Sequence, residues 1–287
     1  MEDKFTISEE LEKYGSFVRI NNINTHMWEI GSGDPVVFIH GFMGANYDWR
    51  FNMPELSKHF AVKAFDLPGF GYSDKPLDFA YTSEGYADFI KAYLDVCSIK
   101  KVVLVGNSMG GQIALQAYMK YPERVSALVL IDSGGCPGSV HFLLFRLLKI
   151  PVIGDVTMSF LTRSSVRYAL EEIIKDGTII TSNTVDYYYN VYKTANARRI
   201  PSIVVRNMIR DEPHIYSKLG SIKCPVAVIW GAQDNVIPPF YAGLFKNSIL
   251  NAEVTIVPDA GHMPQVERAK TVNDIISRFI TKVACGV

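Results

Sequence analysis

Ser108 is the side chain whose surroundings most strongly indicate chemistry. It lies in Gly106-Asn107-Ser108-Met109-Gly110, directly after the apolar run Val102 to Val105. The run predicts a buried strand of a parallel sheet, and residues 111–121 predict a helix. A serine at a sharp strand-to-helix turn has a strained backbone, and the flanking glycines remove side chains that would clash there. We therefore predict a nucleophile at the N-terminus of a helix, whose dipole favours negative charge.

A serine hydroxyl is a weak nucleophile at neutral pH and needs a base that accepts its proton. Of the six histidines, His262 has the best context, because its loop Asp259-Ala260-Gly261-His262-Met263-Pro264 follows the last predicted strand. In this topology the loop returns to the carboxyl edge of the sheet, which also carries Ser108. We predict His262 as the base. Surface or packing roles are expected for four other histidines, namely His26, His59, His141 and His214.

The imidazole in turn needs a carboxylate that fixes its tautomer. Asp234 follows the predicted strand Val226 to Trp230, in Gly231-Ala232-Gln233-Asp234. With this aspartate, the chain order is Ser108, Asp234, His262. This is the nucleophile, acid, base order that accompanies a serine at such a strand-to-helix turn. Asp234 is therefore favoured as the acid. Asp132, at the end of the predicted strand Val125 to Ile131, stays open as the alternative acid, and would otherwise cap a turn.

A tetrahedral intermediate also needs hydrogen-bond donors for its negatively charged oxygen, the oxyanion. The N–H of Met109, at the start of the predicted helix, would supply one donor. The second is expected in the loop after the predicted strand Val36 to Ile39, and we assign it to Phe42 in His40-Gly41-Phe42-Met43-Gly44. His40 is predicted to order this loop rather than to transfer a proton.

Over nearly its whole length the chain resembles the α/β-hydrolase superfamily. The resemblance implies a mostly parallel sheet flanked by helices, a serine nucleophile with a catalytic triad, and no cofactor or metal. Five motifs carry it, in the order found in the superfamily: His40-Gly41-Phe42-Met43-Gly44, Asp66-Leu67-Pro68-Gly69-Phe70-Gly71-Tyr72-Ser73, Gly106-Asn107-Ser108-Met109-Gly110-Gly111, Gly231-Ala232-Gln233-Asp234 and Gly261-His262.

Asn107 and Met109-Gly110-Gly111 also resemble the hydrolases that cleave carbon–carbon bonds in ring-fission products of aromatic catabolism. Those enzymes usually carry a tryptophan after the catalytic histidine, and an arginine in the lid that holds a substrate carboxylate. Here Met263 follows His262, and the lid stretch that resembles theirs continues into tyrosines, which leaves Arg198 and Arg199 as substitutes for that arginine. Related haloalkane dehalogenases and epoxide hydrolases use an aspartate nucleophile, so Ser108 excludes their chemistry.

Strand and helix patterns alternate through residues 1–135 and again through 218–287, which predicts one α/β-hydrolase core. Within it, residues 16–30 predict an antiparallel hairpin, Asn46 predicts the cap of a helix that runs towards His59, and Thr82 predicts the start of a helix that ends near Cys97. Residues 136–217 contain no strand pattern and are predicted to form a helical cap, or lid. Such an insertion would cover the carboxyl edge of the sheet, where ligands bind in α/β folds.

The segment Phe142 to Ile150 is apolar except for Arg146 and Lys149. We interpret it as a lid helix that roofs an apolar pocket, because these charges and Pro151 interrupt the roughly 20 apolar residues of a membrane span. Shallow contact with a membrane surface is the alternative interpretation. Further along the lid, four residues at helical spacing are predicted to pack together, with one tyrosine facing the pocket: Val185, Tyr188, Tyr189 and Tyr192.

The 287 residues include 29 basic and 29 acidic side chains, so the formal net charge is zero. This balance gives no reason to expect nucleic acid or an anionic surface as a partner. Neither metal-binding motifs nor a secretory signal are apparent. The cysteines show no C-x-x-C spacing and are expected to be reduced thiols of a cytoplasmic protein: Cys97, Cys136, Cys224 and Cys285.

These features predict a serine hydrolase, most simply a carboxylesterase that cleaves small to medium apolar esters through an acyl-enzyme on Ser108. Carbon–carbon hydrolysis of ring-fission products is the enzymatic alternative. A small-molecule receptor on a hydrolase scaffold is the non-enzymatic one. The expected partner is a small-molecule ester, without nucleic acid, stable membrane insertion, cofactor or metal, and the chain would be a monomer or a homodimer.

Overall fold

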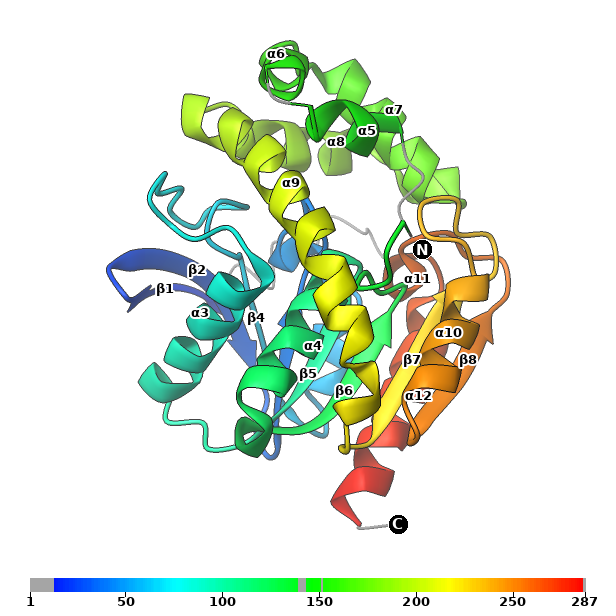
Figure 1. The fold of residues 1–287 in the computed structure, drawn as a ribbon. Coiled ribbons are helices and arrows are strands. Elements are labelled where there is room, and N and C mark those ends of the chain that lie inside the picture. The colour runs from blue at the N-terminus through cyan, green and yellow to red at the C-terminus, as the bar shows by residue number, and fades with distance from the viewer. Residues whose placement is uncertain (1–12, 139–142, 151, 286–287) are drawn as a thin grey trace.

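The computed structural model describes residues 13–138, 143–150 and 152–285. Its centre is an eight-stranded sheet of order β1-β2-β4-β3-β5-β6-β7-β8 (Figure 1). The first two strands form the predicted antiparallel hairpin, β2 pairs antiparallel with β4, and the other neighbours are parallel. The strands are β1 Gly15–Ile20, β2 Ile23–Ile30, β3 Pro35–Ile39, β4 Ala61–Phe65, β5 Val102–Asn107, β6 Val125–Ile131, β7 Val226–Gly231 and β8 Ala252–Val257.

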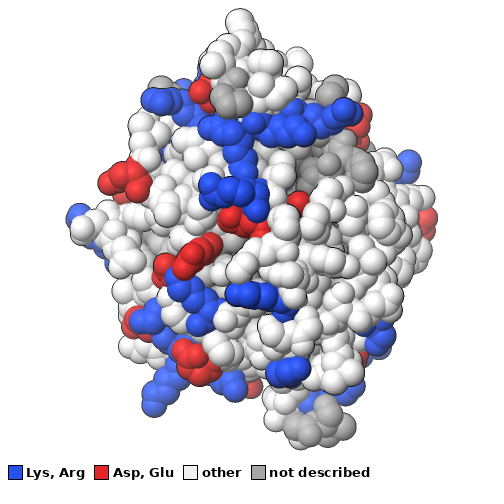
Figure 2. All heavy atoms as spheres, viewed as in Figure 1, with Lys and Arg blue, Asp and Glu red and all other residues white. Residues whose placement is uncertain are grey.

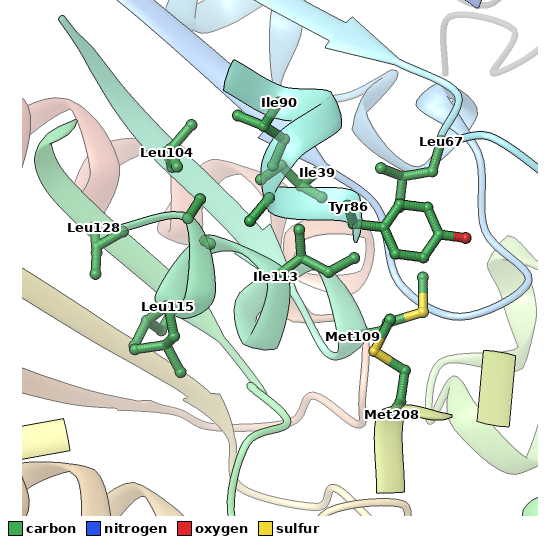
Figure 3. Close-up of a cluster of buried hydrophobic side chains, with 14 of the residues drawn as sticks. Ile39, Leu67, Tyr86, Ile90, Leu104, Met109, Ile113, Leu115, Leu128 and Met208 are labelled. Atoms are coloured by element: carbon green, nitrogen blue, oxygen red, sulfur yellow. The ribbon is translucent and has the colours of Figure 1, made fainter. Parts of the chain in front are cut away.

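Side chains alternate between the two faces of the sheet and supply two apolar layers. On β5, Val102 and Leu104 belong to one buried cluster, whereas Val103 and Val105 belong to the other. This alternation follows from the two-residue period of a strand, so a strand buried on both faces must be apolar throughout. Figure 3 shows part of the first cluster, with Leu104 and Leu128 from the sheet and Ile113 and Leu115 from the helix between β5 and β6.

Helices cover both faces of the sheet. The first cluster contains side chains of α3 (Ser83–Val96), α4 (Met109–Lys120) and α10 (Phe240–Ser248), and the second those of α2 (Met53–Leu56) and α12 (Ala269–Ala284). Thr82 caps α3 as predicted, since its hydroxyl accepts a hydrogen bond from the N–H of Gly85. The remaining short helices outside residues 136–217 are η1 Asn46–Trp49, η2 Pro122–Arg124, η4 Leu219–Ser221 and α11 Pro264–Glu267.

The prediction of one helix from Asn46 towards His59 was wrong. Two short pieces, η1 and α2, occupy this stretch, and Ala45 rather than Asn46 precedes the first. The backbone N–H of Asn46 donates to Asp66 Oδ1 at 2.7 Å. This N–H group would be an unpaired donor at the N-terminus of the predicted helix. Here it is bound by a residue far along the chain.

The segment between β6 and β7 is mainly helical. It contains α5 Leu143–Leu148, α6 Ile153–Ser159, α7 Arg163–Ile173, η3 Gly177–Ile179, α8 Ser182–Val191 and α9 Ala195–Ser217. In Figure 1, α5 to α8 lie above the sheet, and the long α9 descends beside α4. The predicted helix from Phe142 begins at Leu143 in the described residues, and Phe142, His141 and Pro151 lie outside them.

Candidate active site

Ser108 sits in a tight turn between β5 and α4 with φ 54° and ψ −119°. This is a conformation that L-residues other than glycine seldom adopt, so the surrounding contacts must hold it. The N–H of Ser108 donates to Ile131 O at 2.9 Å, and its carbonyl accepts from Gly111 and Gly134. A Cβ on Gly106 would lie 2.3 Å from Gly110 O, which explains the glycine at this position.

His262 and Asp234 form a buried hydrogen-bonded pair. His262 Nδ1 lies 2.7 Å from Asp234 Oδ2. The other carboxylate oxygen, Oδ1, accepts from the N–H groups of Val236 at 2.7 Å and Ile237 at 3.0 Å. These two donors fix the carboxylate, and the carboxylate in turn favours a proton on Nδ1. Nε2 of His262 is then free to act as a base.

The loop that carries His262 is anchored by contacts that the sequence analysis did not find. The His262 N–H donates to Ile173 O at 2.9 Å, and its carbonyl accepts from Asn107 Nδ2 at 3.1 Å. Glu267 accepts from the N–H of Gly261 at 2.8 Å and from that of Lys175 at 2.7 Å. Burial raises the pKa of Glu267, although backbone donors act against this shift. A buried acid that binds backbone groups has no sequence signature.

Asp132 lies beside the pair without bonding to the imidazole. Its Oδ1 accepts from the N–H of Gly231 at 2.9 Å, which links the ends of β6 and β7. Burial, and then the negative charge of Asp234, raise the pKa of Asp132 well above its usual value. Asp234, not Asp132, is the acid whose carboxylate His262 contacts.

These same three residues are also the only described group whose potential metal-ligating atoms all lie close together, within 4.8 Å. A metal ion bound there would take one ligand atom from each of these three side chains. Nδ1 already bonds to Asp234, and Asp132 Oδ1 already accepts a hydrogen bond from the N–H of Gly231. These hydrogen bonds already use atoms that a metal ion would need.

The loop after β3 runs directly against the serine. A Cβ on Gly41 would lie 3.3 Å from Ser108 Cβ, so a side chain at this position would be crowded against the serine. Beside Ser108 is a small cavity of about 30 Å³ whose lining includes Phe42 and Met109. Met109 is the first residue of α4, so its N–H has no acceptor within the helix. The cavity can hold one oxygen-sized group near both candidate donors.

His40 is buried at the base of this loop. Nδ1 lies 2.7 Å from Gly41 O, and Nε2 accepts from the Leu67 N–H at 3.0 Å. Both ring nitrogens therefore bind backbone groups, one as donor and one as acceptor, which requires the neutral imidazole. Burial lowers the pKa of His40, although the charge of Asp66 partly opposes this effect.

We expect His40 to make the protein less stable as the pH falls below the ordinary histidine value of 6.5. The unfolded chain binds a proton there that the folded site resists, so the stabilisation present above this pH is lost as the pH falls towards the lowered pKa. Urea unfolding of wild type and His40→Asn at several pH values between neutral and acidic tests this. The variant should lose less unfolding free energy on acidification, and equal losses would contradict the prediction.

A larger cavity of about 300 Å³ opens over these groups. Ser108 and His262 both line it, although among the described residues no hydrogen bond joins them. Such contacts are often long in ligand-free enzymes and tighten with the substrate. The helices between β6 and β7 supply much of the wall, including Phe145 of α5, Met158 of α6 and Leu170 of α7. The lining is mainly apolar, which suits a hydrophobic ligand.

Asp48 is an acid in this cavity that the sequence analysis missed. It is buried, and the hydroxyl of Tyr188 donates to it. Burial raises the pKa of Asp48 to about 7, with Tyr188 and Arg50 acting against this rise. No Lys or Arg lines the cavity within the described ranges. The only signal for Asp48 in the sequence is its position eight residues after His40.

The other predicted side chains lie as follows. Tyr188 and Tyr192 both line the cavity, so two of the predicted tyrosines face it rather than one. Arg198 does not line it, because its guanidinium donates to the backbone oxygens of Tyr192 and Ser159. Arg199 is exposed, and His26 is a buried packing histidine that pairs with Asp66 at 3.0 Å.

Comparison with known families identifies the fold. A family model for the alpha/beta hydrolase fold matches residues 34–269. The protein is an α/β hydrolase. Among sequence relatives of this α/β hydrolase, the 2-hydroxy-6-oxo-6-(2'-aminophenyl)hexa-2,4-dienoic acid hydrolase of Metapseudomonas resinovorans is 28% identical over 275 residues, which cover 93% of this chain and 91% of the relative.

Solved structures agree with this fold. A variant of the meta-cleavage product hydrolase CumD from Pseudomonas fluorescens superposes with a TM-score of 0.80 at 22% identity, covering 94% of this chain and 98% of that one. A thermophilic esterase from Thermogutta terrifontis gives a TM-score of 0.79 at 23% identity, again covering 94% and 98%. These likenesses support the α/β-hydrolase fold and do not select a substrate. In the part of the chain described, no helix combines the length and apolarity needed to cross a membrane.

Proposed function

We propose that this α/β hydrolase is a carboxylesterase with Ser108, Asp234 and His262 as its catalytic triad. The observation that carries the proposal is the 2.7 Å contact between His262 Nδ1 and Asp234, in a cavity that the strained Ser108 also lines. The pair leaves Nε2 as the proton acceptor, and the turn exposes the hydroxyl to a ligand.

In the proposed reaction, Ser108 Oγ attacks the ester carbonyl while His262 Nε2 takes the hydroxyl proton. The N–H groups of Phe42 and Met109 hold the resulting oxyanion. His262 then returns the proton to the departing alcohol, which leaves an acyl group on Ser108. A water molecule, deprotonated by the same imidazole, attacks this acyl-enzyme, and the imidazolium returns that proton to Ser108 Oγ as the acid departs. Asp234 stabilises the imidazolium in both steps.

We propose that residues 136–217 act as the lid of this enzyme, over a core formed by residues 1–135 and 218–287. Helices α5 to α8 contribute side chains to the cavity wall, so a substrate must contact both the core and this segment. The apolar lining favours an ester whose acyl or alcohol part is hydrophobic. A cavity of about 300 Å³ fits a small to medium molecule.

Carbon–carbon hydrolysis is the second candidate, since one relative is a dienoic acid hydrolase. A dienoic acid carries a carboxylate, which is costly to bury without a cation. Asp48 argues against it, because this acid becomes negatively charged as the pH rises through about 7, and no Lys or Arg lines the described part of the cavity. An acid without a basic partner in the described cavity lining therefore favours an uncharged ester over a carboxylate substrate.

The test compares purified enzyme on a panel of p-nitrophenyl esters of increasing acyl length with a ring-fission dienoate. We expect sustained hydrolysis of the esters, with kcat/KM rising as the acyl group fills the apolar cavity, and negligible cleavage of the dienoate. Fast, selective cleavage of the dienoate would overturn the proposal. A burst of one equivalent of p-nitrophenol without further turnover would instead indicate a receptor on a hydrolase scaffold.

A further inference from the structure

Five large apolar side chains are exposed together around α6, and we call them the apolar tip: Ile150, Val152, Ile153, Val156 and Phe160. Val152 and Phe160 are 71% and 76% exposed. On α6 itself, Ile153 and Val156 are three residues apart and share one face, whereas Gly154 and Met158 are buried. The helix thus buries one apolar face and presents a second to solvent. Such a cluster marks a surface that binds a partner.

Basic side chains border the apolar tip. Arg146 and Lys149 are exposed beside it on and after α5, and Arg199 is exposed on α9. Arg198 lies at the end of α6, because its Nη1 donates to Ser159 O at 2.9 Å. In Figure 2 the top of this face, where Figure 1 has α6, is mostly uncharged, and Lys and Arg gather just below it. One acid, Asp155 of α6, is exposed within the tip, but these four basic side chains around it leave the region locally basic although the chain has no net charge.

The apolar tip is continuous with the mouth of the large cavity. Phe160 both belongs to the tip and lines the cavity, and Met158 lines the cavity from the buried face of the same helix. Tyr168 of α7 is also exposed and lines the cavity. An apolar molecule at the tip would therefore reach Ser108 along a continuous apolar surface.

We propose that the apolar tip docks this α/β hydrolase onto an anionic phospholipid surface, with the cavity mouth facing the lipid. Apolar side chains surrounded by Lys and Arg bind well to an anionic membrane surface. The apolar side chains enter the boundary of the acyl chains, and the Lys and Arg side chains contact the negative headgroups. A protein partner would also cover apolar surface, but would close the mouth that the substrate uses. Because α6 has seven residues, it lies on the membrane and does not cross it.

Co-sedimentation with vesicles tests the proposal and does not depend on catalysis. The full chain is mixed with vesicles of phosphatidylcholine alone or of phosphatidylcholine with phosphatidylglycerol. We expect binding to the mixed vesicles that weakens as salt is added, and weaker binding to the neutral ones. The Ser108→Ala variant should bind vesicles like wild type. Vesicle binding therefore tests docking independently of whether the esterase proposal holds.

Two sets of variants separate the apolar and charged contributions. Val156→Ser combined with Phe160→Ser should weaken binding to both kinds of vesicle by at least about ten-fold. The reason is that two apolar side chains are no longer transferred from water into the membrane. Arg146→Glu with Lys149→Glu should weaken binding only to the anionic vesicles. The matched control is Leu250→Ser, an apolar residue that is 87% exposed outside the tip and should bind like wild type.

Three outcomes would overturn the proposal. Wild type could fail to sediment with either vesicle, or Leu250→Ser could lose as much binding as the tip variant. Alternatively, light scattering could detect a dimer that the tip substitutions dissociate while vesicle binding is absent. That last result would assign the apolar tip to contact between two copies of the chain. Thermal melts of each variant check that the substitutions leave the fold intact.

Discussion

Replacement of Ser108 by alanine is expected to abolish ester hydrolysis, with a loss in kcat on the order of 10⁵ to 10⁶. The loss should be this large because the proposed reaction forms a covalent bond to Oγ, and no other group in the site can replace it. The variant should also lose labelling by a fluorophosphonate, which reacts with the same activated oxygen. Mass spectrometry of the labelled chain and initial rates on p-nitrophenyl esters measure both effects.

The control for this substitution is Ser202→Ala. Ser202 is a fully buried serine of α9 whose hydroxyl has no hydrogen-bond partner in the described structure. Its removal should leave activity and labelling unchanged, since no hydrogen bond is lost. If Ser108→Ala retained covalent labelling with an unchanged fold, the nucleophile would be another residue and the proposed mechanism would fail.

Asp234→Asn is expected to reduce kcat by about 10⁴-fold, whereas Asp132→Asn should stay within about ten-fold of wild type. At residue 234 the amide oxygen can still accept from the N–H groups of Val236 and Ile237, so its NH₂ group then faces His262 and favours the wrong tautomer. At residue 132 the carboxyl makes no hydrogen bond to His262, and an amide oxygen there can still accept from the N–H of Gly231. A neutral amide of the same shape therefore changes little.

Steady-state kinetics of the two variants on one ester, together with thermal melts, make this comparison. A large loss in Asp132→Asn with a small loss in Asp234→Asn would mean that Asp132 orients the base when substrate is bound. Equal large losses, without loss of stability, would mean that the two carboxyl groups act as one unit. Either result would correct the assignment of the acid.

The local sequence was sufficient for the elements that position Ser108. Continuous apolar runs such as Val102 to Val105 occur where a strand is buried on both faces, and Thr82 and Gly106 mark a helix start and a close backbone approach. These signals depend only on neighbouring residues. The stretch after Asn46 was predicted incorrectly because its N–H bonds to Asp66, twenty residues away, and no local pattern reports that contact.

The sequence by itself determined the α/β-hydrolase fold family, and it predicted Ser108 and His262 as partners, because motifs at the ends of parallel strands meet at one edge of the sheet. Only the tertiary structure decided which aspartate bonds to His262, that Asp48 enters the cavity, and that apolar side chains around α6 remain exposed. Each of these depends on burial, or on contacts between segments far apart along the chain. Both arise only when the helices pack against the core.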